Sequence, residues 1–387
     1  MTGKAEEPAG ARMEGCLYSV ATFANLTGAP ISALNHAAQL GGHFASVRLV
    51  LPGTGDLLAR AEAAGVPAQV VAVENRGLRK RLLRRTLLRD LGAAIGSRWG
   101  YFATLRREFR KGPGIVHVHD RTTIAPLALL AARCGGLPSV LHVRYPARTL
   151  GERLQVGLLS ALADAAVFVS DGVRRGYGGW IRGKVRVIHN FMALPPVAAV
   201  GGRRRPRIAM VSQMSPAKGT DLFLGACARL RAGGEEFGAW MVGRWGGAAE
   251  KAKAEEYIRD HDLAGAVEIR DQETEMGRVY GEMDVLVLPT RRDAFPRVVM
   301  EAMCHGVPVV ATRIDGVPEM VADGETGYLV DPEDEAGFAE AVARLLRDEG
   351  LRRRMGAAGR ERAREIFSPE AYERATMELY REIGGRG

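Results

Sequence analysis

The feature that most limits how this chain can fold is a repeated alternation of short apolar runs with helical stretches. The strand-like runs before residue 192 are CLYSVATF, SVRLVLP, AQVVAV, IVHVHD, SVLHVR, DAAVFVS and VRVIH. Helix-like stretches separate them, among them one predicted over about residues 30–42. Short strands joined by crossover helices are typical of a parallel, doubly wound sheet. Because the runs are rich in Val and Ile at successive positions, both faces of the sheet are expected to be buried.

The alternation stops once, in the Pro/Gly/Arg-rich stretch MALPPVAAVGGRRRP, and then resumes. The later strand-like runs are RIAMVSQ, GAWMVG, VEIR, DVLVLP and VPVVAT, with helices predicted near 219–232 and 248–260. Such a break is typical of a linker, so two α/β domains are expected. The predicted parts are a flexible leader (1–11), a first domain (12–191), a linker (192–206), a second domain (207–367) and a terminal helix (368–387) that packs back on the first domain.

Composition places the chain among globular proteins. Apolar residues make up 47% and charged residues 26% of the 387 positions, which is too apolar for a disordered chain. The four cysteines are far apart and show no metal-ligand spacing, as in a reduced cytosolic protein. MTGKAEEPAG lacks the apolar core of a signal peptide, and no uncharged apolar run reaches the roughly 18 residues that a membrane helix needs. A cytoplasmic protein, soluble or peripheral at the inner face of a membrane, is expected.

Charge is distributed unevenly along the sequence. Residues 1–200 contain 26 Lys and Arg against 12 Asp and Glu, a net charge of +14. The remainder contains 28 basic and 33 acidic residues, a net charge of −5. The two halves are therefore expected to meet different partners.

Several common motifs are missing. The sequence has no GxGxxG after a strand, no GxxxxGK[ST], no HExxH and no GxSxG. Their absence argues against a nicotinamide dehydrogenase, a P-loop NTPase, a zinc protease and an α/β-hydrolase.

The stretch DAFPRVVMEAMCHGVPVVAT (293–312) places two carboxylates eight residues apart, Asp293 and Glu301. Glu301 stands among Val299, Met300 and Ala302, where a buried unpaired carboxylate would cost several kcal/mol. It must therefore face solvent, form an ion pair, or accept hydrogen bonds from a ligand. Pro296 is predicted in the first turn of a helix, so the residues before it lie near free N–H groups that favour anionic or hydroxyl oxygens.

Together with VSQMSPAKGTDLFLGA (211–226) upstream and IDGVPEMVADGETGYLV (314–330) downstream, this stretch resembles the retaining GT-B glycosyltransferases of family 4, the glycogen synthase and mannosyltransferase kind. The match runs in order from Met210 to about Val330, and the amino-terminal half resembles the family more loosely. The resemblance implies two Rossmann-like domains that face a central crevice. It also implies transfer of a sugar from a nucleoside-diphosphate sugar, such as a UDP or GDP sugar, to an acceptor.

The resemblance assigns roles in the second domain. Glu301 would accept hydrogen bonds from the ribose hydroxyls, a buried ion pair being the alternative. Asp293, where the family usually has glutamate, would lie beside the donor sugar, and the backbone amides of Ala294 and Phe295 would bind its hydroxyls. Lys218 matches the lysine that binds the donor diphosphate, the alternative being a surface lysine in a turn.

The sequence also departs from the family pattern. Gln213 occupies the position of an arginine that forms the second cationic clamp on the diphosphate. Arg297 and Arg244 are candidates to replace it, or else are solvated surface charges. Asp315 replaces the first glycine of a GGxPE motif, and Glu319 is expected to have a structural role there.

In the first domain the resemblance points to four residues. Gly28 corresponds to one of two glycines in a loop after the first strand. His119 matches a histidine that faces the reacting sugar, and a satisfied histidine at a strand end is the alternative. His142 matches a common family histidine, and Arg144 beside it is a candidate for binding an acidic acceptor.

The implied reaction retains the anomeric configuration and needs no metal or other cofactor, since Lys218 and helix N-termini would meet the diphosphate charge. The acceptor is a glycan, a lipid-linked sugar or a small molecule. Two alternatives remain open, another GT-B enzyme (an epimerase or a phosphorylase) and a basic protein that binds a membrane or nucleic acid without transferase activity. Nucleic acid is not expected, because no stacking-aromatic motif of an RNA-binding module accompanies the basic residues.

Residues 76–111 carry a further hypothesis. They contain an arginine cluster with Trp99, Tyr101 and Phe102 between two basic helical stretches. Basic and aromatic side chains favour the surface of an anionic membrane, so this segment is predicted to contact a membrane or a lipid-linked acceptor.

Overall fold

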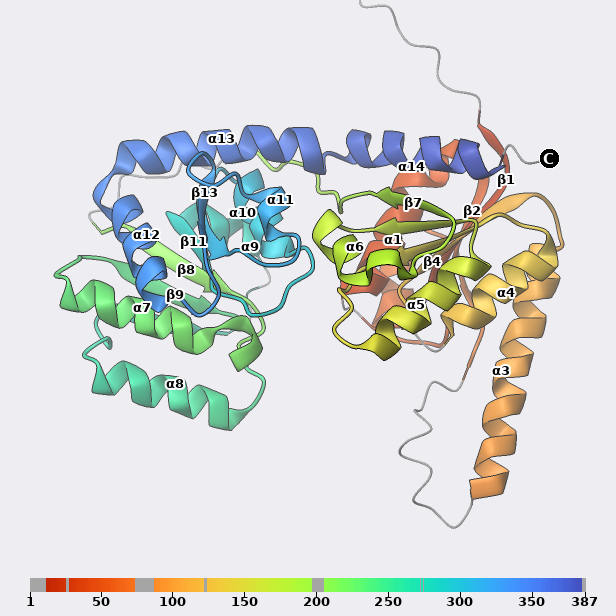
Figure 1. Ribbon diagram of the computed structural model, residues 1–387, viewed down its shortest axis with the longest axis horizontal. Coiled ribbons are helices and arrows are strands. Elements are labelled where there is room, and N and C mark those ends of the chain that lie inside the picture. Colours follow the sequence, from red (N-terminus) through yellow and green to blue (C-terminus); the bar gives the residue numbers. More distant parts are fainter. Residues whose placement is uncertain are drawn as a thin grey trace, which may run out of the picture. The chain divides into compact units, whose positions relative to one another are not determined.

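A computed structural model of the protein describes residues 12–25, 28–73, 87–121, 124–196, 205–271, 273 and 275–384, with the backbone alone over 87–94 (Figure 1). The described chain forms two compact units. The first comprises residues up to 168, 176–188 and from 373 onward, and the second comprises 169–175 and 189–372. The sequence predicted one uninterrupted first domain over 12–191, whereas the contacts assign 169–175 and 189–191 to the second unit.

The first unit contains a seven-stranded parallel sheet in the order β3-β2-β1-β4-β5-β6-β7. Its strands are β1 (Met13–Ala21), β2 (Phe44–Leu51), β3 (Ala68–Val70), β4 (Gly114–His119), β5 (Ser139–Val143), β6 (Ala165–Phe168) and β7 (Lys184–Val187). The order reverses next to β1, which is the arrangement of a doubly wound sheet. The predicted parallel α/β fold is confirmed for this unit.

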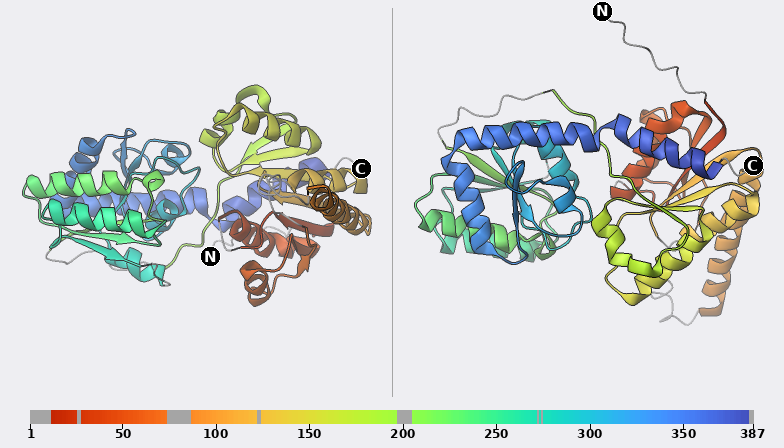
Figure 2. Two further views of the ribbon diagram at one scale, coloured as in Figure 1. Left: turned by 90° about the horizontal axis from the view of Figure 1, so that it is seen from below. Right: turned by 45° about the horizontal axis from the view of Figure 1, so that its top comes forward.

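Helices cover both faces of this sheet (Figure 2). They are α1 (Gly28–Leu40), α2 (Asp56–Ala63), α3 (Leu87–Phe109), α4 (Ala125–Gly135), α5 (Leu150–Leu162), α6 (Asp171–Tyr177) and α14 (Pro369–Gly384), with short 3-10 turns η1 (Gly41–His43) and η3 (Gly178–Trp180). The first part of α6 and the start of α14 belong to the second unit. Small residues of α1, such as Ala33 and Ala37, pack on Leu49 and Leu51 of β2, so the helix lies close to the sheet.

The second unit contains a six-stranded sheet in the order β10-β9-β8-β11-β12-β13, with every ladder parallel. Its strands are β8 (Arg207–Val211), β9 (Gly238–Val242), β10 (Val267–Arg270), β11 (Val285–Leu288), β12 (Val309–Thr312) and β13 (Gly327–Val330). Its helices are α7 (Thr220–Ala232), α8 (Ala248–Asp260), α9 (Met276–Glu282), α10 (Arg297–Cys304), α11 (Val317–Met320), α12 (Glu335–Arg347) and α13 (Glu349–Phe367), with the 3-10 turn η4 (Pro216–Lys218).

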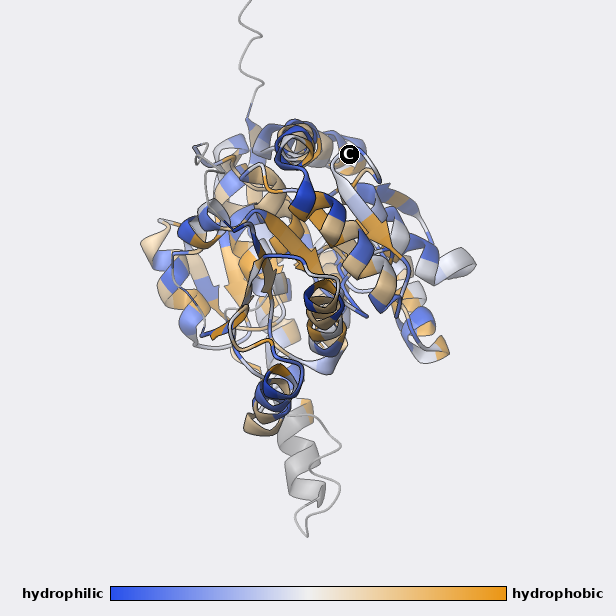
Figure 3. Ribbon diagram, turned by 90° about the vertical axis from the view of Figure 1, so that its left-hand side faces the viewer, coloured by the Kyte–Doolittle hydropathy of each residue, from blue (hydrophilic) through white to orange (hydrophobic). Residues whose placement is uncertain are grey.

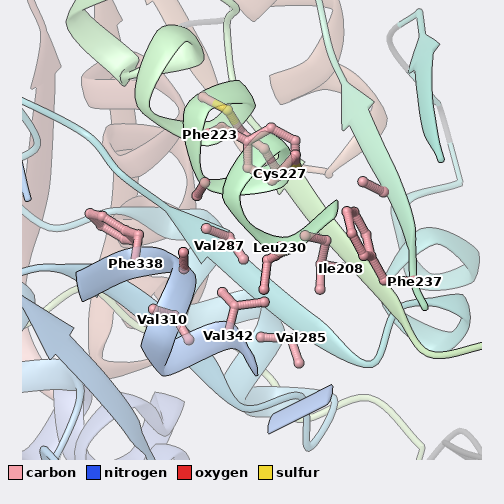
Figure 4. Packing of buried hydrophobic residues seen from close by; sticks show 14 of the residues in the cluster. Ile208, Phe223, Cys227, Leu230, Phe237, Val285, Val287, Val310, Phe338 and Val342 are labelled. Carbon is pink, nitrogen blue, oxygen red and sulfur yellow. The ribbon is translucent and has the colours of Figure 1, made fainter. Parts of the chain in front are cut away.

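One face of the second sheet forms a continuous apolar core with α7 and α12 (Figure 4). Phe223 and Leu230 of α7 meet Phe338 and Val342 of α12 over the central strands. Burial of an aliphatic or aromatic side chain contributes about 1.5–3 kcal/mol, so this core holds the strand ends, and the loops that follow them, in fixed positions. In the hydropathy view the apolar residues gather along the strands, as expected for sheets covered on both faces (Figure 3).

The segment proposed to contact a membrane only partly fits that role. Residues 76–86 lie outside the described residues, and α3 follows them. Trp99 is 68% exposed, but Tyr101 and Phe102 are buried at 1% and 9%, so these two are core residues and not part of an interface. Among the described helices, none combines the length and the hydropathy needed to cross a bilayer.

Two predicted connecting segments fall largely outside the description. The leader, residues 1–11, and residues 197–204 of the predicted linker are not described. Residues 192–196 have no regular secondary structure.

Candidate functional site

The turn that carries Lys218 is tightly held in the second unit. It follows β8 as η4 and ends at Gly219, whose φ of 76° is in the left-handed region. A Cβ atom there would lie 1.9 Å from the carbonyl oxygen of Pro289, so only glycine fits. The N–H of Arg291 donates to the carbonyl of Ala217 at 3.0 Å. The loops after β8 and β11 are therefore joined at the carboxyl edge of the sheet.

This junction brings together two residues predicted from separate motifs. The Nζ of Lys218 donates to Oδ2 of Asp293 at 2.6 Å and to the carbonyl of Arg292 at 3.3 Å. The two side chains are 27% and 21% exposed, so the ion pair is half-buried and can still be reached by a ligand. An ammonium has three protons, and a phosphate oxygen could take the third while the carboxylate holds the chain in place.

Ala294 and Phe295 form a buried connection between Asp293 and α10. The ring of Phe295 stacks on His189 with centroids 5.0 Å apart and an angle of 12° between planes. The carbonyl of Ala294 accepts a hydrogen bond from Ser170 at 3.2 Å. Helix α10 begins at Arg297, and Pro296 is its N-cap, one residue before the predicted first turn. The hydrogen bond from Ser170 and the stacking on His189 thus hold the backbone of Ala294 and Phe295, which would face a donor sugar.

Glu301 has protein partners for its carboxylate. The hydroxyl of Tyr280 donates to Oε2 at 2.6 Å, and the guanidinium of Arg297 lies 3.3 Å from Oε1. Burial first, and the adjacent carboxylate second, raise the pKa of Tyr280 well above its ordinary value, so the phenol stays a donor. The Glu301 side chain is 19% exposed, and each carboxylate oxygen can accept a further hydrogen bond. The ion pair and the ligand contact that the sequence left open are therefore compatible.

The two candidates to replace the missing arginine lie in different places. Arg297 is occupied with Glu301 on the same helix. Arg244 is exposed in the loop after β9. Met214 and Trp245 form an isolated parallel bridge, and Gln213 and Arg244 are the residues immediately before them. Arg244 is therefore next to Gln213, the position where the resemblance expected an arginine.

Glu319 holds the start of α6. Its carboxylate accepts hydrogen bonds from the N–H groups of Asp171 at 2.8 Å and Gly172 at 2.7 Å, and it lies 3.1 Å from Nε2 of His189. Burial by itself would raise the pKa of Glu319, but the hydrogen bond to His189 and the two backbone N–H groups outweigh it and lower the pKa. This geometry fits the structural role expected for Glu319.

In the first unit, the predicted residues at the ends of β4 and β5 form a buried polar cluster. His119 and His142 are direct partners in the β4–β5 ladder. Both rings have no exposed surface, and Arg144 is 6% exposed. Nη2 of Arg144 is 3.3 Å from Nδ1 of His119 and 3.2 Å from Nδ1 of His142, and Nε2 of His119 is 3.0 Å from the Ser19 hydroxyl. Both ring nitrogens of His119 thus have hydrogen-bond partners within the protein, and a contact with the reacting sugar stays a prediction.

Three further residues complete the cluster, and the sequence interpretation missed them. Nε2 of His117 is 3.1 Å from Nδ1 of His142, and its Nδ1 is 2.7 Å from the hydroxyl of Tyr380. The same hydroxyl is 2.8 Å from Nε2 of His36. His117 could have been found, because residues i and i+2 of a strand share a face. His36 on α1 and Tyr380 on α14 are too distant in sequence for any local signal.

Burial first, and the nearby Arg144 guanidinium in addition, lower the pKa of each of the four histidines, and together they lower that of His36 to about 3. The rings are therefore neutral at physiological pH. Candidate ligand atoms of His36, His117 and His119 lie within 4.8 Å of one another, close enough to consider a cation. The hydrogen bonds already made by all three rings, and the positive charge of Arg144, oppose that use.

Gly28 is the first residue of α1 and is exposed. A Cβ atom at Gly28 would meet no described protein atom within 4 Å. Protein packing therefore gives no reason for glycine at this position, and the close approach of a ligand remains a prediction.

Comparison with known proteins places family matches on both units. The family model described as "Glycosyltransferase Family 4" matches residues 26–194, and the model described as "Glycosyl transferases group 1" matches residues 202–362. Among curated proteins, a D-inositol 3-phosphate glycosyltransferase of Corynebacterium diphtheriae is 36% identical over 174 residues, which are 43% of this chain and 40% of that protein. The lipopolysaccharide core biosynthesis glycosyltransferase LpsE of Rhizobium meliloti is 28% identical over 52% of this chain and 58% of its own length. The chain thus spans about half the length of these curated relatives.

Solved structures match along nearly the whole chain. Anabaena HepE in complex with UDP has a TM-score of 0.79 at 16% identity, over 95% of this chain and 99% of that chain. A glycosyltransferase from Rickettsia africae has a TM-score of 0.78 at 17% identity, over 97% of this chain and all of that chain. At these identities the likeness concerns the fold.

Proposed function

The chain is a GT-B glycosyltransferase of family 4, and from this membership we propose that it transfers a sugar from a nucleoside-diphosphate sugar to an acceptor hydroxyl. The observation that carries the proposal is the junction of Lys218 and Asp293, with Glu301 eight residues further along the chain in α10. A cation, an acid and a half-buried carboxylate are the groups that a diphosphate, a sugar and a ribose require. A binding protein without transferase activity is not favoured, because the family matches cover both units.

Each side chain has a task in this proposal. Glu301 accepts hydrogen bonds from the ribose hydroxyls while Tyr280 and Arg297 hold it in place. Lys218 donates one hydrogen bond to the diphosphate, and Asp293 accepts a hydrogen bond from the donor sugar. Stabilising the charge that develops on the leaving diphosphate is the main contribution, and loss of one such contact typically costs about 2.7–4 kcal/mol.

The donor is proposed to be a UDP or GDP sugar. UDP is favoured because the similar HepE structures contain UDP or UDP-glucose. Isothermal titration of the wild type with UDP, GDP and ADP tests this directly. One of the first two should bind with a Kd in the micromolar range, and Glu301→Ala should weaken binding by about 1–3 kcal/mol. Unchanged affinity in a folded Glu301→Ala protein would refute the ribose role, and a preference for ADP would refute the choice of base.

Retention of configuration and independence of metal are part of the proposal. Leaving-group departure and acceptor attack on one face would need no separate catalytic base, the leaving phosphate taking the acceptor proton. Proton NMR of the first product formed reports its anomeric configuration, and an α-linked product from an α-linked donor is expected. Activity should survive EDTA, and loss of activity that Mg²⁺ or Mn²⁺ restores would show a required cation.

The acceptor is proposed to be a sugar, a lipid-linked sugar or an anionic molecule bound by the first unit. The net charge of +14 over residues 1–200 supports contact with an anionic membrane face, where each basic residue contributes about 1 kcal/mol. The protein should float with anionic vesicles at low salt and detach at high salt. Binding should fall when three arginines outside the described residues, Arg81, Arg84 and Arg85, are changed to Glu. It should not fall in the control variant with Lys253→Glu and Arg259→Glu on α8. Absence of binding at low salt would leave these arginines as ordinary surface charge.

A further inference from the structure

The buried cluster of the first unit determines its own proton positions, which can be read from the distances. Arginine only donates hydrogen bonds, so the Nδ1 atoms of His119 and His142 that face Arg144 must both be acceptors. A neutral imidazole has one proton, and in both rings it is therefore on Nε2. In His119 this N–H donates to the Ser19 hydroxyl, which donates in turn to the carbonyl of Ala33 at 2.8 Å.

The remaining members follow in order. Because Nδ1 of His142 has no proton, the nitrogen of His117 that faces it, Nε2, carries one, and the single lone pair of Nδ1 is shared between the donors of Arg144 and His117. The Nδ1 of His117 then accepts from the hydroxyl of Tyr380, so that hydroxyl must accept the N–H of His36. One consistent assignment results, and it depends on a charged donor at one end and a hydroxyl at the other.

Among the ring nitrogens of the four histidines, this assignment leaves one without a hydrogen-bond partner among the described residues. The Nε2–H of His142 is buried and has no hydrogen-bond partner among the described residues. A buried donor without a hydrogen-bond partner costs free energy of folding, and such groups are rare in natural proteins. His142 is the penultimate residue of β5, close to the carboxyl edge of the sheet, and in doubly wound sheets ligands bind beyond that edge.

We propose that Tyr380 and Arg144 are positioning residues that lock the histidines into this single set of tautomers, so that His142 offers its Nε2–H to an oxygen of the acceptor substrate. The oxygen is a hydroxyl or a phosphate oxygen. The proposal rests on the proposed function only in its last step, because the tautomers belong to the protein without ligand.

The role of Tyr380 gives the terminal helix a task beyond packing. Its hydroxyl is hydrogen-bonded to His117 and His36, and its ring also lies against both rings. Its ring packs on Phe44 in an edge-to-face arrangement with centroids 5.9 Å apart, which fixes the direction of the hydroxyl. Loss of the hydroxyl would orphan an acceptor on His117 and a donor on His36 at the same time.

The first experiment uses the full chain without substrate. Long-range ¹H–¹⁵N NMR of histidine-labelled protein distinguishes protonated from unprotonated ring nitrogens. We expect unprotonated Nδ1 in His117, His119 and His142. Tyr380→Phe should broaden or shift the His117 and His36 signals and lower the Tm by several degrees. A protonated Nδ1 in His142, or Tyr380→Phe signals identical to the wild type, would overturn the proposal.

Tyr101→Phe is the matched control. Tyr101 is also fully buried in the first unit, but its hydroxyl has no hydrogen-bond partner among the described residues. Its removal should leave the histidine signals unchanged.

The second experiment separates positioning from binding. In His142→Asn the side-chain oxygen lies near the place of Nδ1 and can still accept from Arg144, whereas the Nε2–H is lost. Titration of the wild type with inorganic phosphate and with glucose should move the His142 Nε2 signal for at least one of them. In His142→Asn the affinity for that probe should fall about tenfold with the fold retained. Equal affinity in the two proteins, or no response to either probe, would overturn the binding step.

With an identified acceptor, His142→Asn should raise the KM for the acceptor about tenfold or more and leave the donor KM unchanged. If the protein transfers no sugar, the proposed function is refuted. If the tautomers are then still as assigned, the hydrogen-bond assignment of the histidine cluster is supported independently of the function. About one equivalent of zinc in the purified protein, lost in His36→Gln, would overturn the assignment, because a metal-bound nitrogen cannot accept a hydrogen bond.

Discussion

At the scale of single residues, the ion pair between Lys218 and Asp293 has two opposite effects on the binding of a diphosphate. Asp293 holds the lysine in position, but it also competes with a diphosphate for the ammonium protons. If the negative charge on the diphosphate grows during the reaction, the ammonium of Lys218 binds the phosphate more strongly relative to Asp293. Lys218 then stabilises the transition state more than the bound substrate.

We predict that Lys218→Ala lowers kcat more than it lowers the affinity for the free nucleoside. The reason is that the ammonium acts on phosphate charge that is largest in the transition state, so removal of the contact should cost about 2.7–4 kcal/mol in kcat/KM. Uridine and UDP titrations, run beside steady-state kinetics, measure both effects. Arg291→Lys is not a suitable control, because Arg291 holds the same loop through Asp221 and Glu333. Lys251→Ala on α8 is a better one, and equal losses of uridine binding and of kcat in Lys218→Ala would contradict the assignment.

Gln213 stands where the resemblance expected an arginine, and this leads to a second prediction. Gln213 and Arg244 precede the two bridged residues Met214 and Trp245, so they occupy neighbouring backbone positions. We expect Arg244→Ala to raise the donor KM about tenfold, and Gln213→Arg in the same chain to restore most of the loss.

Steady-state kinetics of the wild type, the two single variants and the double variant form a complete cycle. Rescue in the double variant would be specific to replacement of one cation by another. If the double variant is no better than Arg244→Ala, Arg244 does not replace the missing arginine. Lys253→Ala, at an exposed position of α8, should be neutral in the same assay.

At the scale of elements, much of the architecture could be predicted from the sequence. The strands are short, apolar and flanked by turn residues, and this pattern predicted both parallel sheets. The segment after β11 was predicted as a helix with Pro296 in its first turn, and the structure begins that helix one residue later. An N-cap depends on the backbone angles of a single residue, which composition does not determine.

The site was predicted only as far as local patterns reach. Lys218, Asp293 and Glu301 come from motifs along the chain, and the contact between Lys218 and Asp293 follows from parallel strands that end at one edge. Tyr280, His36 and Tyr380 were not predicted, since each reaches its partner across distant elements. Tyr101 and Phe102 were assigned to an interface because their aromatic character was read without the packing that buries them.

The start of α6 provides a prediction at this scale. Glu319 satisfies the N–H groups of Asp171 and Gly172, which are the free donors of a helix N-terminus. Glu319→Gln keeps the size of the side chain but removes the charge, and it should destabilise this contact by about 1–3 kcal/mol. Hydrogen exchange at the two amides should become about 5- to 150-fold faster, whereas Glu340→Gln on α12 should leave it unchanged. Unaltered protection would mean that other contacts hold this helix start.

At the scale of the whole molecule, the two units differ in what they bury. The second unit has a continuous apolar core between its sheet and α7 and α12. The first unit buries apolar residues too, but it also buries four histidines and an arginine, which are hydrogen-bonded to one another and to Tyr380 of α14. A core of neutral histidines is stable only while the rings remain neutral, which makes the stability of the first unit depend on pH.

The last prediction follows from the direction of these pKa shifts. Burial, helped by Arg144, lowers the folded-state pKa of His36, His117, His119 and His142 below the ordinary value of 6.5, and that of His36 to about 3. Below pH 6.5 the unfolded chain therefore binds more protons than the folded one, so stability is greatest above this pH and falls as the pH drops. Each ring contributes about 1.4 kcal/mol per pH unit until its folded pKa is reached, or about 2 kcal/mol for His36 at pH 5.

Urea unfolding between pH 7.5 and 4.5 measures this dependence, and the free energy of unfolding should fall steeply below pH 6.5. His36→Gln keeps an N–H near the place of Nε2 for Tyr380 but cannot titrate, so its curve should be shallower by about one proton. His261→Gln, which removes an exposed histidine from the second unit, should leave the steep slope in place. Equal slopes in His36→Gln and the wild type would mean that His36 is already protonated in the folded protein. The hydrogen bond from Nε2 to Tyr380 would then not require a neutral ring. The histidine cluster would carry a positive charge on His36, which the guanidinium of Arg144 repels.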